Sequence, residues 1–170
     1  DNNKLKNELA EAYQDLSPEF IFSHPAYNVR STEINAVLGR SQLKQLDLRN
    51  DVRRRNLELF LKALDGNRFR TDFRVEGNCN YAFTLILKHP DENLRNRVEN
   101  ALRSMKVEFR RGTSGGGNQL RQPYLRQRLG DLYHNFPQVE HVHFFGYYIG
   151  NYPDLEIHKL ETLCEVLNKC

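Results

Sequence analysis

The amino-acid sequence predicts an α/β fold of the α+β kind, in which helices cover a small, mainly antiparallel sheet and a long connecting helix precedes it. Three observations predict it. Apolar residues recur at helical spacing through residues 31–64. Three short apolar or aromatic segments, at 81–88, 106–110 and 145–149, have the length of strands. Helical segments separate these strands, and this alternation around a small sheet favours helices on one face.

The composition is that of a chain with one well-buried core and an arm. Of its 170 residues, 39% are hydrophobic and 28% are charged, which suffices for one domain core. No segment approaches the roughly 18 apolar residues that cross a bilayer, and no signal peptide opens the sequence. The three cysteines are odd in number and lack a CxxC spacing. We therefore expect a cytoplasmic protein with reduced thiols that binds neither a membrane nor a metal.

The first 30 residues are expected to form a helix and an extended arm. Residues 4–15 place apolar side chains at helical spacing in a polar background. Residues 16–30 contain Pro18 and Pro25 around an aromatic run, a pattern typical of extended chain. Because the sequence starts at Asp1 rather than at a methionine, we expect it to begin inside a longer gene product.

Residues 31–66 are expected to form the connecting helix. Ser31 is a suitable N-cap, and Glu33 lies in the first turn, where a carboxylate suits the helix dipole. Gly66 lies where a terminating residue is expected, and a bend is expected near residues 47–51. A helix this long in a small domain usually connects two bodies or packs across a dimer.

Residues 67–170 are expected to form the C-terminal small domain. The pattern of apolar, proline and glycine residues predicts its elements in this order: a strand at 81–88, a helix at 91–104, a strand at 106–110, a flexible loop at 112–118, a helix at 120–132 broken by Pro123, a strand at 145–149, and a helix from Pro153 to Asn168.

Few residues have the setting of a catalyst. A nucleophilic lysine needs an apolar or charge-perturbed environment, and all eight lysines lie in polar sequence contexts. His141 and His143 have the spacing of a metal pair on a strand, but no third ligand lies near them in the sequence. We therefore expect neither a catalytic residue nor a metal site in this chain.

The glycine-rich loop at 112–118 offers backbone amides between arginines. It lacks the lysine of a phosphate-binding P-loop. Arg110 and Arg111 precede it and Arg121 follows it, and the guanidinium group matches phosphate geometry. The residues leave two interpretations open: a plain surface loop, or a loop that grips a diphosphate.

A second anion site is suggested where the arm meets the connecting helix. Tyr27, Asn28 and Arg30 lie just before the expected helix N-terminus, whose unpaired N–H groups favour a phosphate. Capping of the helix by Ser31 or Asn28 explains the same pattern without a ligand.

Three stretches of the sequence resemble one enzyme family. Residues 23–43 (SHPAYNVRSTEINAVLGRSQL) are similar to the signature of the DegT/DnrJ/EryC1/StrS sugar aminotransferases, in which GYNYR precedes an acidic residue and A-x-x-G-x-x-Q-L. Residues 109–123 look like a motif of the family's dehydrase-like branch, and residues 146–153 (GYYIGNYP) look like its last strand and turn. The resemblance covers roughly Leu16 to the C-terminus.

The resemblance implies a fold type I enzyme that uses pyridoxal 5′-phosphate (PLP) and acts on a nucleotide-linked keto-sugar. It implies that Asn28 reaches the cofactor phosphate of the neighbouring subunit across a homodimer, with Tyr27 and Arg30 beside the same pocket. His24 matches a histidine of the dehydrase-like branch. On the substrate side, together with His24, the resemblance implies four residues: Arg110, Arg111, Asn118 and Arg121.

The resemblance also implies that the large domain, with the lysine or histidine that acts at the cofactor, lies outside this chain. Amino transfer and dehydration therefore both remain open, and the chain alone is expected to be inactive. Two other functions remain: a dimerisation or adaptor domain without a cofactor, and a nucleic-acid binder. Arginine supplies 17 of the 25 basic residues, but the net charge is only +3, so nucleic acid is the weaker interpretation.

Overall fold

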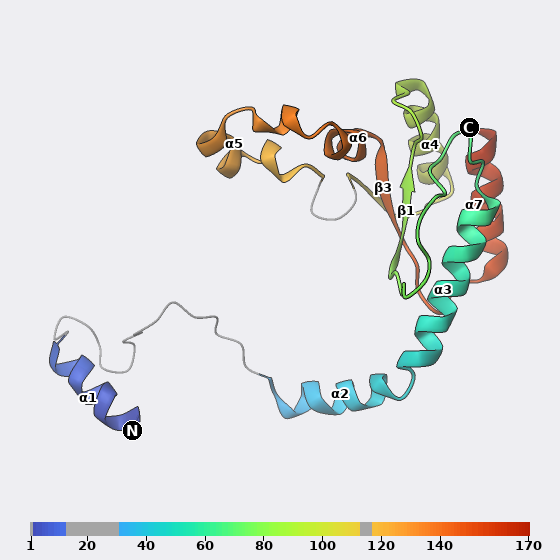
Figure 1. Ribbon diagram of the computed structural model, residues 1–170. Helices are drawn as coiled ribbons and strands as arrows, with labels where there is room; N and C mark the ends of the chain where they lie inside the picture. The colour runs from blue at the N-terminus through green and yellow to red at the C-terminus, as the bar shows by residue number, and fades with distance from the viewer. Residues whose placement is uncertain (1, 13–30, 113–116) are drawn as a thin grey trace. The chain divides into compact units, whose positions relative to one another are not determined.

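The computed structural model describes residues 2–12, 31–112 and 117–170. The chain divides into two compact units, Asp1–Gln42 and Leu43–Cys170. The second unit contains the sheet and the hydrophobic core (Figure 1). The boundary falls inside the expected connecting helix. The assignment of the first 30 residues to a separate large domain stays a prediction.

The first unit contains helices α1 (Asn2–Ala12) and α2 (Glu33–Leu43). The hydroxyl of Thr32 accepts a hydrogen bond from the backbone N–H of Asn35 at 3.4 Å. Thr32 rather than Ser31 therefore caps α2, because a capping side chain must reach the N–H three residues ahead. No residue of α2 is buried, and Ile34, Val37 and Leu38 are exposed. The apolar stripe of this helix is thus not used for packing within the described residues.

The expected single helix is two helices. Helix α2 ends at Leu43 and α3 spans Leu46–Ala63, so the interruption lies at residues 44–45 and not near residues 47–51. The chain becomes extended at Leu64, whose N–H still donates to the Phe60 carbonyl at 3.2 Å. Gly66 therefore does not terminate the helix.

Three short strands form an antiparallel sheet in the order β1-β3-β2: β1 (Ala82–Ile86), β2 (Phe109–Arg111) and β3 (Gly146–Gly150). The register places Phe83 opposite Ile149, and Leu85 opposite Tyr147. Because successive side chains of a strand point to opposite faces, these four buried residues share one face. The predicted small antiparallel sheet is confirmed.

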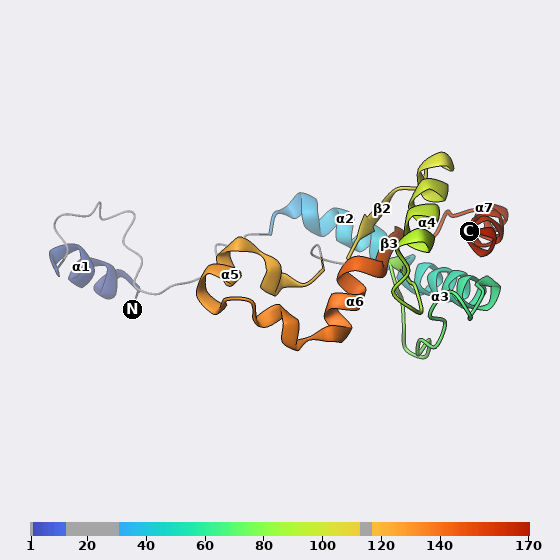
Figure 2. The same ribbon diagram turned by 90° about the horizontal axis from the view of Figure 1, so that it is seen from above.

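Helices α3, α4 (Glu92–Ser104) and α7 (Ile157–Lys169) lie on one side of this sheet (Figures 1 and 2). They bury Phe60, Val98 and Leu160 in the core. The rings of Phe60 and Phe83 stack with their centroids 4.5 Å apart. The expected cover of helices on one face is therefore confirmed, and burial of this apolar surface is the main force that holds the unit together.

Two buried asparagines join helix α3 to the ends of the strands. The Asn56 amide donates to the Asn151 side-chain oxygen at 3.2 Å. The Asn151 amide in turn donates to the backbone carbonyls of Arg53 and Asn80 at 3.0 and 2.9 Å. Because buried amides are costly without partners, this network fixes how the end of β3 meets α3.

The segment between β2 and β3 contains more helix than the sequence predicted. It forms four short elements: η2 (Gln119–Arg121), α5 (Pro123–Leu129), η3 (Leu132–Asn135) and α6 (Pro137–Phe145). Pro123 and Pro137 lie in the first turns of α5 and α6, where the fixed φ and missing N–H of proline are tolerated. Pro123 thus starts a helix rather than breaking one, and Phe145 ends α6 rather than belonging to β3.

The last helix begins later than expected. Pro153 lies in a turn closed by a hydrogen bond from the Leu155 N–H to the Tyr152 carbonyl at 3.1 Å, and α7 starts at Ile157. Proline is favoured at this second position of a turn, so the Pro153-Asp154 pair marks a turn and not a helix start.

Candidate functional site

Arg110 and Arg111 are neighbours in strand β2 and therefore point to opposite faces of the sheet. The register pairs Arg110 with Tyr148 and Arg111 with Tyr147 on β3. Tyr147 is fully buried in the core, whereas Tyr148 is half-buried on the other face. The strand thus separates the two guanidinium groups, and they do not converge on one phosphate.

Glu99 of helix α4 engages Arg111 on the covered face. Arg111 Nη1 lies 3.8 Å from Glu99 Oε1, and the Tyr147 hydroxyl donates to the same oxygen at 3.2 Å. Burial, with the Glu99 carboxylate close by, raises the pKa of Tyr147 well above its ordinary value. Tyr147 therefore remains a neutral donor, and Arg111 belongs to a polar cluster at the edge of the core.

Arg110 lies on the opposite face, against an aromatic pair. Its guanidinium carbon is 5.9 Å from the centroid of the Tyr148 ring, a distance at which the ring face attracts a cation. Tyr81 meets Tyr148 edge-to-face with centroids 5.5 Å apart, and its hydrogen bond to Tyr148 raises the pKa of that hydroxyl. Among the residues that the structure describes, no carboxylate forms an ion pair with Arg110.

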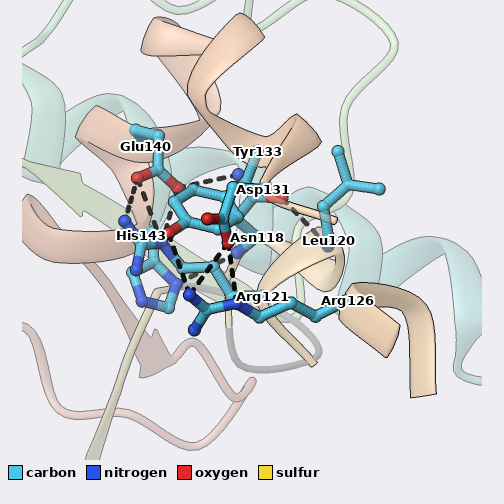
Figure 3. A network of polar contacts seen from close by, with 8 residues as sticks. All are labelled: Asn118, Leu120, Arg121, Arg126, Asp131, Tyr133, Glu140 and His143. Atoms are coloured by element: carbon cyan, nitrogen blue, oxygen red, sulfur yellow. Dashed lines mark hydrogen bonds and ion pairs between the residues drawn. The ribbon is translucent and has the colours of Figure 1, made fainter. Parts of the chain in front are cut away.

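Asn118 is buried and directed inward at the end of the glycine-rich loop (Figure 3). Its backbone N–H donates to His143 Nδ1 at 3.1 Å, and its side-chain amide donates to Glu140 Oε1 at 2.8 Å. Its side-chain oxygen accepts from the Leu120 N–H at 3.1 Å, which caps η2. Asn118 therefore ties η2 to α6.

Arg121 is held by the same carboxylate. Its Nε donates to both oxygens of Glu140, at 2.8 and 3.0 Å, and its Nη2 pairs with Glu140 Oε2. The guanidinium carbon lies 4.1 Å from the centroid of the Tyr133 ring and 4.9 Å from that of Phe144. Hydrogen bonding between the partners lowers the pKa of Glu140 and raises that of Arg121. Both groups stay charged, and each neutralises the other.

Gly117 needs to be glycine for two reasons. Its φ is +87°, which disfavours any residue with a Cβ, and a Cβ built there would lie 2.3 Å from His143 Nδ1. The close approach allows His143 to accept from the Asn118 N–H. For this bond Nδ1 must be unprotonated, so His143 holds the chain while neutral.

The residues expected at the cofactor lie outside the described residues. They are Tyr27, Asn28 and Arg30, together with His24 on the substrate side. Their roles stay predictions. Along the sequence, the nearest helical residue that the structure describes is Glu33, the first residue of α2.

Two residues that contact the end of the glycine-rich loop, Glu140 and His143, were not predicted from the sequence. Glu140 and His143 lie on α6, three residues apart, and so share one face of that helix. The spacing of His141 and His143 is that of neighbouring outward positions on a strand, but both residues lie in helix α6. In the helix they point to different partners, because the His141 ring contacts the Leu87 carbonyl at 2.6 Å. The sequence feature that could have predicted helix α6 is Pro137 at its start, followed by Glu140 in its first turn.

The arrangement offers charge and hydrogen bonds but little catalysis. Within residues 2–12, 31–112 and 117–170 no group of His, Cys, Asp or Glu has the spacing to hold a metal ion. In the same ranges no helix is long and apolar enough to span a membrane. Asn118 and Arg121 are engaged inside the molecule, and the half-exposed Arg111 lies 3.8 Å from Glu99, so among the described substrate-side residues Arg110 is the one without a carboxylate partner.

Comparison with known protein families gives a match over nearly the whole chain. The model of the DegT/DnrJ/EryC1/StrS aminotransferase family matches residues 5–168. Among curated proteins, the GDP-4-keto-6-deoxy-D-mannose 3-dehydratase of Yersinia pseudotuberculosis is 24% identical over 152 residues, which are 88% of this chain and 38% of that protein.

Solved structures give the same result. An Escherichia coli GDP-4-keto-6-deoxy-D-mannose-3-dehydratase with bound hydrated PLP superposes with a TM-score of 0.72 at 26% identity, over 88% of this chain and 39% of that one. A sugar aminotransferase from Streptococcus pneumoniae in its PMP form has a TM-score of 0.73 over 86% of this chain and 37% of that one, and at 15% identity it shows the fold alone. The chain thus spans about two fifths of the length of these relatives.

Proposed function

Because this chain belongs to the DegT/DnrJ/EryC1/StrS aminotransferase family, we propose that it is the C-terminal part of a PLP-dependent enzyme that aminates or dehydrates a nucleotide-linked keto-sugar. The observation that carries this proposal is the match of sequence and of fold, each over 88% of the chain, to GDP-4-keto-6-deoxy-D-mannose 3-dehydratases. We further propose that the whole protein is a cytoplasmic homodimer that serves deoxysugar or surface-polysaccharide synthesis.

The arm before α2 fits a role at a cofactor phosphate. Helix α2 starts at Glu33, three residues after Arg30, and it has eleven residues. The N-terminus of a helix that long attracts phosphate through its unpaired N–H groups. In this proposal Asn28 donates to the phosphate of PLP in the partner's site, and Tyr27 and Arg30 border it. PLP supplies the electron sink in either reaction, and the protein orients it.

Asn28→Ala tests this role in the full-length protein that carries the chain. Loss of one hydrogen bond to a charged phosphate is expected to weaken PLP retention about tenfold. The measurement is an absorbance titration of the apo protein with PLP. Asn96→Ala is the control, because Asn96 is an exposed residue of α4 and should leave PLP affinity unchanged. Unchanged PLP affinity in the Asn28 variant would count against the proposed contact.

A further inference from the structure

Helix α3 contains a buried hydrogen-bond donor without an acceptor. Arg53 is a half-buried residue of this helix, and its Nε is shielded from solvent. Among the described residues, nothing accepts a hydrogen bond from this Nε. A buried donor that stays unpaired is destabilising, so nearly all such groups in native proteins have a partner. The guanidinium group of Arg53 therefore needs an acceptor that the described residues do not provide.

The groups beside Arg53 are already engaged with other partners. The Arg53 carbonyl accepts from the Asn151 side-chain amide at 3.0 Å, and the same amide donates to the Asn80 carbonyl at 2.9 Å. Asp51, a carboxylate two residues before Arg53, pairs with Arg54 at 2.7 Å. Within the described part of the chain, the charge of Arg53 thus has no carboxylate beside it.

Two exposed tyrosines lie close to Arg53 along this network. Tyr81 directly follows Asn80 and Tyr152 directly follows Asn151, so each is one residue from the amide that reaches the Arg53 carbonyl. Their exposed fractions are 62% and 52%. Tyrosine and arginine are enriched among the residues that anchor protein interfaces. A shielded cation beside exposed tyrosines therefore has the composition of a surface that another polypeptide segment covers.

The chemistry of Arg53 favours a carboxylate as the missing acceptor. Nε and the neighbouring Nη of a guanidinium group present two parallel N–H groups, which match the two oxygens of a carboxylate. A free phosphate would match them as well, but it would leave both tyrosines exposed. A carboxylate on a protein segment brings neighbouring side chains that cover them. This chain matches only 38% and 39% of its relatives' length, so the proposed parent enzyme has further polypeptide to supply such a segment.

We infer that Arg53 is a positioning residue that forms an ion pair with an aspartate or glutamate in the part of the parent enzyme outside this chain. Tyr81 and Tyr152 belong to the same docking surface. The ion pair fixes how the chain sits against that part, and Arg53 touches neither cofactor nor substrate. The inference rests on the proposed function in one respect, since it takes from it that the chain belongs to a longer enzyme.

The first test is Arg53→Met, made both in the 170-residue chain and in the full-length parent, with urea denaturation as the measurement. Methionine keeps an unbranched side chain and removes the donors. In the 170-residue chain the midpoint is expected to stay the same or to rise, because an unpaired buried donor is removed. In the parent it is expected to fall, because a buried carboxylate loses its partner. A lower midpoint in the 170-residue chain, or an unchanged one in the parent, would overturn the inference.

Arg54→Met is the matched control. Arg54 is the next residue of the same helix, and its side chain and that of its partner Asp51 are 48% and 65% exposed. Solvent screens such a pair, so this variant is expected to shift neither midpoint appreciably.

Hydrogen exchange gives a second readout that locates the surface. The backbone amides around Tyr81 and Tyr152 are expected to exchange at least about tenfold more slowly in the parent than in the 170-residue chain. Arg53→Met should remove this protection from the parent, and Arg54→Met should not. Equal exchange in the two proteins would reject the surface.

Phosphate as the acceptor is tested in the same way. If PLP or inorganic pyrophosphate slows these amides in the 170-residue chain, the acceptor is a phosphate and the proposed carboxylate is wrong. The PLP titration of Asn28→Ala tests the proposed function separately, because it measures cofactor binding and not the burial of Arg53.

Discussion

At the scale of single residues, Glu140 determines what Asn118 and Arg121 do. The motif around the glycine-rich loop suggested arginines that await an anion. The structure supplies that anion from α6, because Glu140 accepts from both residues. A sequence cannot show this pairing, since 19 residues separate Glu140 from Arg121 and their contact depends on how α6 folds back.

Glu140→Gln is expected to destabilise the chain by about 2 kcal/mol, because the charged hydrogen bonds of a partly buried arginine are lost. The side chains of Arg121 and Glu140 are 28% and 17% exposed, so solvent replaces little of the lost interaction. The measurement is urea denaturation followed by circular dichroism. Glu76→Gln is the control, because its pairing with Arg74 is fully exposed and should contribute almost nothing. Equal midpoints for the Glu140→Gln variant and the wild type would contradict the role of Glu140.

The same pair predicts a pH dependence. Hydrogen bonds from Arg121, and then from Asn118, lower the pKa of Glu140 below its ordinary value of 4.5 in the folded chain. The carboxyl group therefore stays ionised in the folded state where it is already protonated in the unfolded state. Its stabilisation is complete above pH 4.5 and is lost as the pH falls through the lowered folded pKa. The stability gap between wild type and Glu140→Gln should shrink on acidification below pH 4.5, and a constant gap would contradict this.

At the scale of elements, the sequence predicted some helix boundaries correctly and others wrongly. The helix predicted at 91–104 is α4, whose N-cap Asp91 accepts a hydrogen bond from the Leu94 N–H at 2.9 Å. Pro123 was misread as a break, because a proline in the first turn and a proline in the middle of a helix look alike when the helix boundary is unknown. The helix at 137–145 was missed because its apolar positions do not form a single stripe.

Gly117→Ala tests how closely α6 approaches the loop. An alanine at this position would be strained by the positive φ, and its Cβ would collide with the His143 ring. Gly77→Ala is the matched control, since Gly77 has φ +72° but open space around it. The control is expected to cost about 1 kcal/mol from backbone strain, and Gly117→Ala about 1–3 kcal/mol more from the collision. Equal losses in urea denaturation would show that α6 does not press on this glycine.

At the scale of the whole molecule, the core lies entirely inside the second unit. Its buried cluster begins at Leu57 and ends at Leu167, whereas α2 buries nothing. The hydrophobic core of the chain therefore draws on the second unit alone, and helix α2 of the first unit contributes no buried side chain.

A chain of residues 43–170 is expected to unfold cooperatively with the stability of the full 170 residues, within about 0.5 kcal/mol. The reason is that removal of residues 1–42 takes no member from the core. The comparison is made by thermal and urea unfolding of both chains. A chain of residues 1–156, which lacks α7 and with it Leu160, Leu163 and Leu167, should show no cooperative transition. Loss of cooperativity in residues 43–170 would mean that the first unit completes the fold.

The sequence by itself determined the family, the class of fold, the three strands and the presence of helices α4 and α7. These follow from periodicity and from local motifs, because each is set by residues a few positions apart. Tertiary structure alone decided which residues near the glycine-rich loop are available to a ligand. Alternation along β2 sends Arg110 and Arg111 to opposite faces, and a helix that lies far along the chain neutralises Arg121. The physical reason is that the availability of a charge depends on its neighbours in space.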